Sequence, residues 1–421
     1  MGNNILAGRV VKFFIIALII VFKGLILQAQ THDHSHDGHD HSQHDHSHEG
    51  HDHSHGTTPA GTNAPTPAGH PATLAADGHH EGEQKLDVGK LIIGHVTDAN
   101  EFHVAGKFAI PLPCIVYNKH QGFEIFMSNV FHHGHNSYNG YVLDHGVLKY
   151  VDDPNFPKTG SNEINAIHDG KVSYRGVEFT ASRASFYDFS ITKVVFTMML
   201  AVGLMLWLFI GIARSYKTNM VPKGLQSFFE PIIIFIRDEV AKPNLGHKYE
   251  KYMPYLLTVF FFIWISNMIG LIPFFPGSGN VMGNIAVTAT LALFTFILTN
   301  TAGNKHYWGH IFNPPGTPFP INLIIILIEF LSVFIKPFAL MIRLFANITA
   351  GHIIILSLVS IIFIFAEFAG NAAGFGVSIF ASLFILFMNA LELLVAALQA
   401  YIFTMLSAVF IGQAIEEPHH H

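Results

Sequence analysis

The sequence predicts an all-α polytopic membrane protein whose helices are preceded by a small, mostly β exported domain. Of its 421 residues, 50% are hydrophobic and only 12% are charged. Several apolar runs reach the roughly 20 residues that a helix needs to cross a bilayer. The formal net charge of −6 is too small to indicate a partner. The single cysteine, Cys114, excludes an internal disulfide framework.

Residues 1–30 are typical of a secretory signal peptide. Arg9 and Lys12 precede an apolar core that runs from Phe13 to Phe22, and residues 27–30 form a candidate cleavage region. An uncleaved anchor helix is the competing interpretation, because Lys23 shortens the apolar run without forbidding insertion. We expect cleavage.

Composition predicts a disordered segment over residues 31–84. Residues 31–56 alternate histidine with aspartate and serine, a pattern that suits zinc, nickel or copper. A solvated tail that tolerates histidine is an equally strong interpretation. Residues 57–84 form a linker rich in Pro, Gly and Ala. The weak candidate metal ligands are His32, His34, His36, His39 and His41.

Residues 85–190 predict a small β-rich domain, because short apolar runs alternate with Gly, Asn-Gly and Asp-Pro turn signals. His132, His133 and His135 lie close together in this domain. A closed zinc site needs further ligands that the sequence does not supply, so we interpret the three as surface histidines.

The membrane domain is predicted over residues 191–417. Apolar spans are expected near 192–213, 253–273 and 280–302, with an amphipathic stretch at 221–242 on or near the membrane surface. Lysine and arginine are concentrated between the first and second spans, which predicts a cytoplasmic loop there. The β-rich domain is then expected outside and the C-terminus in the cytoplasm.

Two longer apolar stretches follow, at 321–367 and 372–413. Each holds either two spans or one long, strongly tilted helix, and the expected cytoplasmic C-terminus favours the single helices. Pro337 is expected to bend the first of them.

Charged residues inside these two stretches are costly, since one arginine in a bilayer helix costs about 3 kcal/mol on insertion scales. Glu329, Lys336 and Arg343 stand seven residues apart and share one helical stripe, which Asn347 continues. A functional ion path is the first interpretation and a buried structural ion pair the second.

Glu392 and Gln399 also stand seven residues apart and share one face of the last helix. His352 lies half a revolution from Arg343 on an ideal helix. Either Gly351 permits a local irregularity, or the outer part of an ion path approaches His352 from another side.

Three motifs in the membrane domain resemble those of a known protein family. Residues 336–351 closely resemble the signature of subunit a of F-type ATP synthases. Residues 398–406 resemble that family's last-helix motif, and residues 266–273 resemble an earlier helix. The resemblance covers about 190–417 and leaves the β-rich domain and histidine-rich segment without a counterpart.

The resemblance implies a non-catalytic stator subunit with no cofactor, in a multi-pass fold of the cell inner membrane. The partners it implies are a ring of c subunits, the b subunits of the peripheral stalk, the rest of the complex and the lipid bilayer, with no nucleic acid. Whether H⁺ or Na⁺ is carried depends on the c subunit, and protons are the default expectation.

The resemblance also implies roles for single residues. Arg343 falls on the family's essential arginine, which attracts the ionised carboxylate of a passing c subunit. Glu329 matches a carboxylate near the cytoplasmic half-channel, and Asn347 and Gln399 match polar neighbours of the arginine.

His352 and Glu392 occupy two facing positions of the family's periplasmic half-channel. At these positions the family has a carboxylate and a histidine, and some members have the two exchanged. The resemblance therefore implies that His352 and Glu392 act as a pair.

Two other classes of protein compete with this interpretation. A zinc transporter would use histidine-rich tracts, but it also needs paired histidines and aspartates within the membrane. Aspartate is absent from every predicted span, and His352 is the only histidine in the last two. A metal sensor would need a cytoplasmic output domain, which the sequence does not show after the last span.

Overall fold

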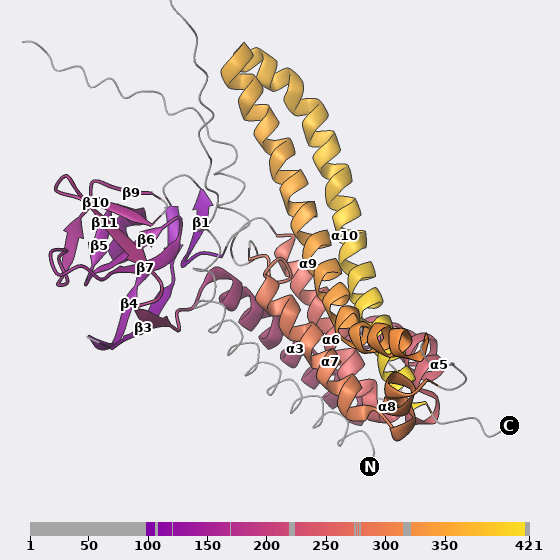
Figure 1. The fold of residues 1–421 in the computed structure, drawn as a ribbon. Coiled ribbons are helices and arrows are strands. Elements are labelled where there is room, and N and C mark those ends of the chain that lie inside the picture. Colours follow the sequence, from indigo (N-terminus) through magenta and orange to yellow (C-terminus); the bar gives the residue numbers. More distant parts are fainter. Residues whose placement is uncertain are drawn as a thin grey trace, which may run out of the picture. The chain divides into compact units, whose positions relative to one another are not determined.

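The computed structural model describes residues 98–416, apart from 106–107, 120, 169, 219–223, 273–274, 276, 278 and 315–320. The described chain is β-rich between Glu101 and Asp188 and helical between Lys193 and Ile415 (Figure 1). This confirms the predicted fold class. The predictions for the signal peptide, the linker and the histidine-rich segment lie outside the described residues, as do the candidate ligands His32, His34, His36, His39 and His41.

The β-rich part contains three antiparallel sheets. Their strand orders are β8-β5-β6-β7-β11-β10-β9, β12-β3-β4 and β1-β2. The strands are β1 (Glu101–Ala105), β2 (Phe108–Pro111), β3 (Pro113–Asn118), β4 (Gly122–Met127), β5 (Asn136–Tyr138), β6 (Tyr141–Asp144), β7 (Val147–Val151), β8 (Ser161–Glu163), β9 (Ala166–His168), β10 (Lys171–Tyr174), β11 (Val177–Ser182) and β12 (Phe186–Asp188).

Three hairpins of the largest sheet turn through two-residue loops. Both residues of each loop have positive φ, which is the backbone of a type I′ turn and matches the twist of the flanking strands. The loops are Asn139-Gly140, His145-Gly146 and Arg175-Gly176. Only the first has the Asn-Gly sequence that signals such a turn.

Asp144, at the end of β6, forms the main buried polar contact of this sheet. Its carboxylate accepts hydrogen bonds from the Gly170 backbone N–H at 2.8 Å and from His145 Nδ1 at 2.7 Å, and it pairs with Lys149 Nζ at 3.1 Å. Burial alone would raise the pKa of Asp144, but the hydrogen bonds from Gly170 and Lys149 outweigh burial and hold that pKa below its ordinary value. The ionised form is therefore the one that stabilises the fold.

We expect Asp144→Asn to lower the free energy of unfolding of the β-rich part by about 1–3 kcal/mol at neutral pH, because the charge-assisted contacts are lost. For the unchanged chain, a lowered folded pKa means that the stabilisation is present above the unfolded value near 3.9 and disappears as pH falls through the folded value. The two chains should therefore converge in stability in strong acid. Pulse proteolysis of the full chain in vesicles measures this, and an equal gap at pH 3 and pH 7 would contradict it.

The helical part contains five helices or helical runs that are long and apolar enough to cross a membrane, among the described residues. The elements are α3 (Lys193–Thr218), α4 (Leu225–Phe235), a π-helical turn (Ile236–Ala241), α5 (Lys242–Leu245), a 3-10 turn (Gly246–Lys248), α6 (Tyr249–Gly270), α7 (Ile285–Ala302), α8 (Lys305–Phe312), α9 (Ile321–Ala369) and α10 (Asn371–Ile415). The stretch predicted at the membrane surface thus continues into α6. Residues 303–320, between two predicted spans, are expected to form a loop, but helix α8 occupies part of this segment.

Helices α9 and α10 are each a single continuous helix, so the single-helix alternative is the one observed. At about 1.5 Å per residue, their 49 and 45 residues span about 73 and 68 Å, far more than the roughly 30 Å of a bilayer's hydrocarbon core. Helices of this length fit within the hydrocarbon core only when they are strongly tilted or bent. Helices α9 and α10 form an antiparallel pair that turns at Gly370, where φ is +83° (Figure 1).

Only a narrow stripe of α9 is buried against other helices. Leu340, Leu344 and Ile348 are buried at four-residue spacing, while large apolar residues on other faces of α9 remain exposed. Helix α6, by contrast, is buried over most of its length and forms the centre of the helical core. The long helices therefore leave an extended apolar surface open to lipid or to a partner.

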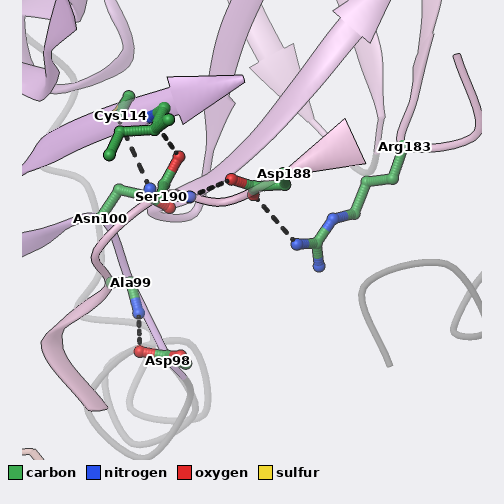
Figure 2. A network of polar contacts seen from close by, with 8 residues as sticks. Asp98, Ala99, Asn100, Cys114, Arg183, Asp188 and Ser190 are labelled. Carbon is green, nitrogen blue, oxygen red and sulfur yellow. Dashed lines mark hydrogen bonds and ion pairs between the residues drawn. The ribbon is translucent and has the colours of Figure 1, made fainter. Parts of the chain in front are cut away.

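Helix α3 is joined to the β-rich part through Asp98, whose contact with Ala99 is drawn in Figure 2. Asp98 Oδ1 accepts hydrogen bonds from the backbone N–H groups of Ala99 at 3.0 Å and Val194 at 3.1 Å. The Lys193 N–H donates to the Ala99 carbonyl at 2.9 Å. Asp98 thus satisfies one of the orphan N–H groups that begin α3, although it lies 96 residues upstream of Val194.

Candidate functional site

Arg343 lies on the exposed side of α9. Leu340 and Leu344 on the same helix are buried, whereas Arg343 and Asn347 are exposed. Ile342 and Phe338 are exposed large apolar residues near Arg343. A cation on such a surface is favourable only beside an anionic partner or water.

Asn347 and Gln399 form a direct link between α9 and α10 one helical turn from Arg343. Asn347 Nδ2 donates to Gln399 Oε1 at 3.0 Å. Gln399 is 1% exposed, and its Nε2 finds no hydrogen-bond partner among the described residues. The structure thus brings together the two amides that the sequence places near the arginine.

His352 and Glu392 face each other between α9 and α10. His352 Nδ1 lies 3.7 Å from Glu392 Oε1, and the Glu392 side chain is 6% exposed. Helix α9 is continuous through Gly351, so His352 reaches Glu392 without a break in the helix. Of the two alternatives left open by the sequence, the local irregularity at Gly351 is not observed.

Gly351 provides the space for the Glu392 carboxylate. A Cβ atom at position 351 would lie 2.9 Å from Glu392 Oε1, closer than real Cβ contacts come, and 3.1 Å from its Cδ, which is also tight, so the carboxylate would have to shift. The absence of a side chain at Gly351 is therefore what lets the carboxylate lie against α9 beside His352.

A small pocket surrounds this pair. It has room for about one ordered water molecule. Ser266 Oγ, Asn267 Oδ1, Asn280 Nδ2 and Glu392 Oε2 are buried without hydrogen-bond partners among the described residues. The pocket is lined by Ser266, Asn267, Gly270, Leu271, Asn280, Ile348, His352, Glu392 and Ala396. This cluster of unsatisfied polar atoms makes the pocket a favourable place for water and for a proton in transit.

Sequence reasoning did not single out Ser266, Asn267 or Asn280 as site residues. The first two stand in the motif at 266–273, so a signal for them existed. Asn280 lies just before α7 in a segment with no charge, and only the fold brings it to Glu392.

A second polar pocket lies beside Lys336 and Pro337, about two helical turns before Arg343 on α9. Lys336 Nζ donates to Gln413 Oε1 at 3.1 Å and lies 5.6 Å from the centre of the Phe410 ring. Burial raises the pKa of Tyr307 in α8, and the negative charge of Glu329 raises it further. The pocket is lined by Thr295, Phe296, Thr299, Asn300, Tyr307, Val333, Lys336, Pro337, Phe410 and Gln413.

The resemblance implies a proton path through His352 and Glu392. On that expectation, Gly351→Ala should reduce proton conduction about tenfold, because the added methyl group forces the Glu392 carboxylate to shift. Alanine is the better helix former by about 1 kcal/mol, so helix stability should not fall. Passive proton flux through vesicles stripped of the catalytic sector measures the effect. Gly376→Ala in α10 is the matched control, because a Cβ atom there meets nothing within 4 Å. Equal flux in the two variants would refute the crowding argument.

The histidines of the β-rich part lie at its surface. His132, His133 and His135 are exposed, and His133 Nδ1 lies 3.3 Å from Glu101 Oε2. Within the described ranges, no group of three His, Cys, Asp or Glu side chains is arranged to hold a metal ion.

Comparison with known proteins finds two family matches and many related sequences. The ATP synthase A chain family matches residues 195–412, and a domain of unknown function matches residues 91–174. ATP synthase subunit a of Chloroherpeton thalassium is 44% identical over 240 residues, which cover 56% of this chain and 69% of that protein. ATP synthase subunit a 2 of Chlorobaculum tepidum is 48% identical over 237 residues, covering 54% of this chain and 64% of that protein. Because the family match covers more than half of the sequence, this chain belongs to the ATP synthase A chain family.

Proposed function

We propose that this chain is the stator subunit that conducts protons in the membrane sector of an F-type ATP synthase, without a catalytic site of its own. The observation that carries the proposal is an exposed arginine on α9 with a polar pocket on either side of it along the helix. By helical rise, Arg343 lies about 10 Å from Lys336 and about 13 Å from His352. This spacing suits two offset half-channels and does not suit one open pore.

The outer half-channel would run through the pocket of His352 and Glu392. Their separation of 3.7 Å is short enough for a proton to pass between them directly or through one water. Asn267 and Asn280 would keep that water in place. Glu329 and the pocket around Lys336 would form the cytoplasmic half-channel.

Arg343 would couple the two half-channels to rotation. A c-subunit carboxyl is neutral when protonated and can face lipid, but its ionised form must stay near a cation. The pull of the arginine is strong in a dry contact and weak once water enters. A proton therefore cannot pass from one half-channel to the other without a carrier, and each transfer moves the ring. Asn347 and Gln399 would position this contact through their own hydrogen bond.

The exposed surface of α9 and α10 that carries Arg343 supports a proposal for the partners. The exposed apolar side of α9 and α10 fits a ring of c subunits around Arg343, and the b subunits and the rest of the complex would hold the chain still. The basic segment between α3 and α6 supports a cytoplasmic location for this segment and for the C-terminus, with the β-rich domain in the periplasm. The chain would need no cofactor and would lie in the cell inner membrane.

The proposal is tested in inverted membrane vesicles from cells that lack this chain. Expressing the chain should restore ATP-driven acidification and a proton leak after the catalytic sector is removed. Zinc uptake should not change. Zinc transport without restored proton coupling would overturn the proposal and favour the metal-transporter alternative.

A further inference from the structure

One face of the β12-β3-β4 sheet is apolar and exposed. Phe123 and Ile125 on β4 are 61% and 66% exposed, and Met127 follows them on the same side. Tyr117 on β3 and Tyr187 on β12 are exposed beside them. Tyr117 pairs with both Phe123 and Tyr187 across the sheet, so these side chains form one continuous patch.

The opposite face of the β12-β3-β4 sheet is well packed, so the exposed apolar face is not part of an incomplete core. Cys114, Val116, Phe126 and Phe186 alternate with the exposed residues and are buried in one hydrophobic cluster. Glu124, the charged residue of β4, accepts a hydrogen bond from Asn139 Nδ2 at 3.2 Å. The sheet therefore has a complete core on one side and a second apolar surface on the other.

An exposed apolar face next to the edge strand β4 is unusual for a domain surrounded by water. Large apolar patches mark interaction surfaces, and exposed strand edges invite aggregation unless they are covered or charged. The outward residues of this patch carry no charge. Lys119, at the end of β3, is exposed at its rim. The pattern calls for an apolar occupant with an anionic or polar border.

The position of the sheet along the chain indicates which occupant this is. Tyr187 precedes Lys193, the first residue of the candidate membrane span α3, by six residues, which can reach about 20 Å at most. The connection is held to the sheet itself. The Phe189 N–H donates to the Ile115 carbonyl at 2.8 Å, and the Ile191 N–H donates to the Pro113 carbonyl at 3.0 Å.

Further contacts make this connection stiff (Figure 2). Ser190 Oγ accepts from the Ile115 N–H at 3.0 Å, and the Ser190 N–H donates to Asp188 Oδ1 at 2.9 Å. Asp98 holds the first turn of α3, as described above. The sheet is thus fixed to the N-terminal end of a membrane helix and cannot move far from the bilayer surface.

We propose that the patch formed by Tyr117, Phe123, Ile125, Met127 and Tyr187 lies on the surface of the bilayer that α3 enters. Tyrosine is enriched at the interface between hydrocarbon and water, where its ring is in the apolar layer and its hydroxyl remains wet. Phe, Ile and Met would enter the layer beneath the headgroups, and Lys119 would meet lipid phosphates. The β-rich domain would then rest on the membrane through this face. The inference does not depend on the proposed function.

The test uses spin labels on the full chain in the assembled complex, reconstituted in lipid vesicles. Nitroxides are placed at Phe123→Cys or Ile125→Cys, with Val177→Cys on β11 as the matched control, because Val177 is also more than half exposed. Cys114, the only native cysteine, is buried, and burial raises its pKa to about 12, so it resists labelling. Power saturation then measures the access of oxygen, which dissolves in lipid, and of a water-soluble nickel chelate.

We expect the oxygen-to-nickel access ratio at positions 123 and 125 to exceed that at position 177 several-fold. Nickel access equal to that at position 177 would mean that the patch faces water, and it would overturn the proposal. Low access of both reagents would mean that a protein covers the patch, and it would also overturn the proposal. As a second measurement, Ile125→Glu should lower the oxygen access of a label at position 123, while Val177→Glu should leave it unchanged.

Discussion

Arg343→Ala should reduce ATP synthesis and ATP-driven proton pumping to background while the complex still assembles. At about 4 Å and an effective dielectric constant near 20, the attraction between two opposite charges is worth about 4 kcal/mol, on the order of a thousandfold in occupancy. Arg343 is exposed on α9, so its removal leaves no cavity in the helical core. Fluorescence quenching in inverted vesicles measures pumping, and immunoblotting of the purified complex measures assembly.

Lys336→Ala provides a comparison within the same helical stripe, although Lys336 itself lines the pocket assigned to the cytoplasmic half-channel. It removes a cation from the same helical stripe and loses only a hydrogen bond to Gln413 and contact with the Phe410 ring. We expect partial activity in that variant, because exposed polar contacts of this kind are worth about 1 kcal/mol or less. Normal pumping by the Arg343→Ala complex would refute the role of the arginine. Loss of assembly in both variants would instead indicate a structural role for this stripe.

The long helices could be predicted from sequence because their signal is simple. Apolar runs longer than the thickness of a bilayer, with few charges, admit few structures, and α9 and α10 are each the single helix that one of the two interpretations expected. Helix α8 was missed because its Lys305-to-Phe312 sequence mixes charge, aromatics and glycine with no clear period. Asp98 could not be found either. Its contact with Val194 joins residues 96 positions apart, and no local pattern reports such a contact.

In the candidate site, too, some residues could be predicted from the sequence and others could not. The resemblance implies that Asn347 and Gln399 each lie near Arg343, and in the structure Asn347 Nδ2 donates to Gln399 Oε1 at 3.0 Å. The position of His352 could not be decided from a single helix, since its orientation has meaning only when α10 supplies Glu392. Asn280 enters the pocket from a loop, and loop placement depends on tertiary packing that helical periodicity does not describe.

The second large effect is expected at the pair of His352 and Glu392. His352→Glu and Glu392→His should each reduce proton conduction and ATP synthesis severely, because each change leaves two like groups in one small pocket. The His352→Glu, Glu392→His double variant should recover a measurable part of the activity. Its two groups regain a carboxylate beside an imidazole at the observed 3.7 Å separation. Initial rates of proton flux in all four chains form a double-mutant cycle.

Space and burial decide how far this recovery can go. Position 392 faces Gly351, and the Glu392 carboxylate already lies 2.9 Å from where a Cβ atom at position 351 would be, so an imidazole at position 392 would have little spare space. Position 352 is more exposed than position 392, at 22% against 6%, so a carboxylate moved there is better hydrated and holds its proton less tightly. We therefore expect recovery to be partial. If the double variant conducts no better than either single variant, the two residues do not act as a pair. If His352→Ala alone conducts normally, the outer path runs through Glu392 and the asparagines of the pocket without the imidazole.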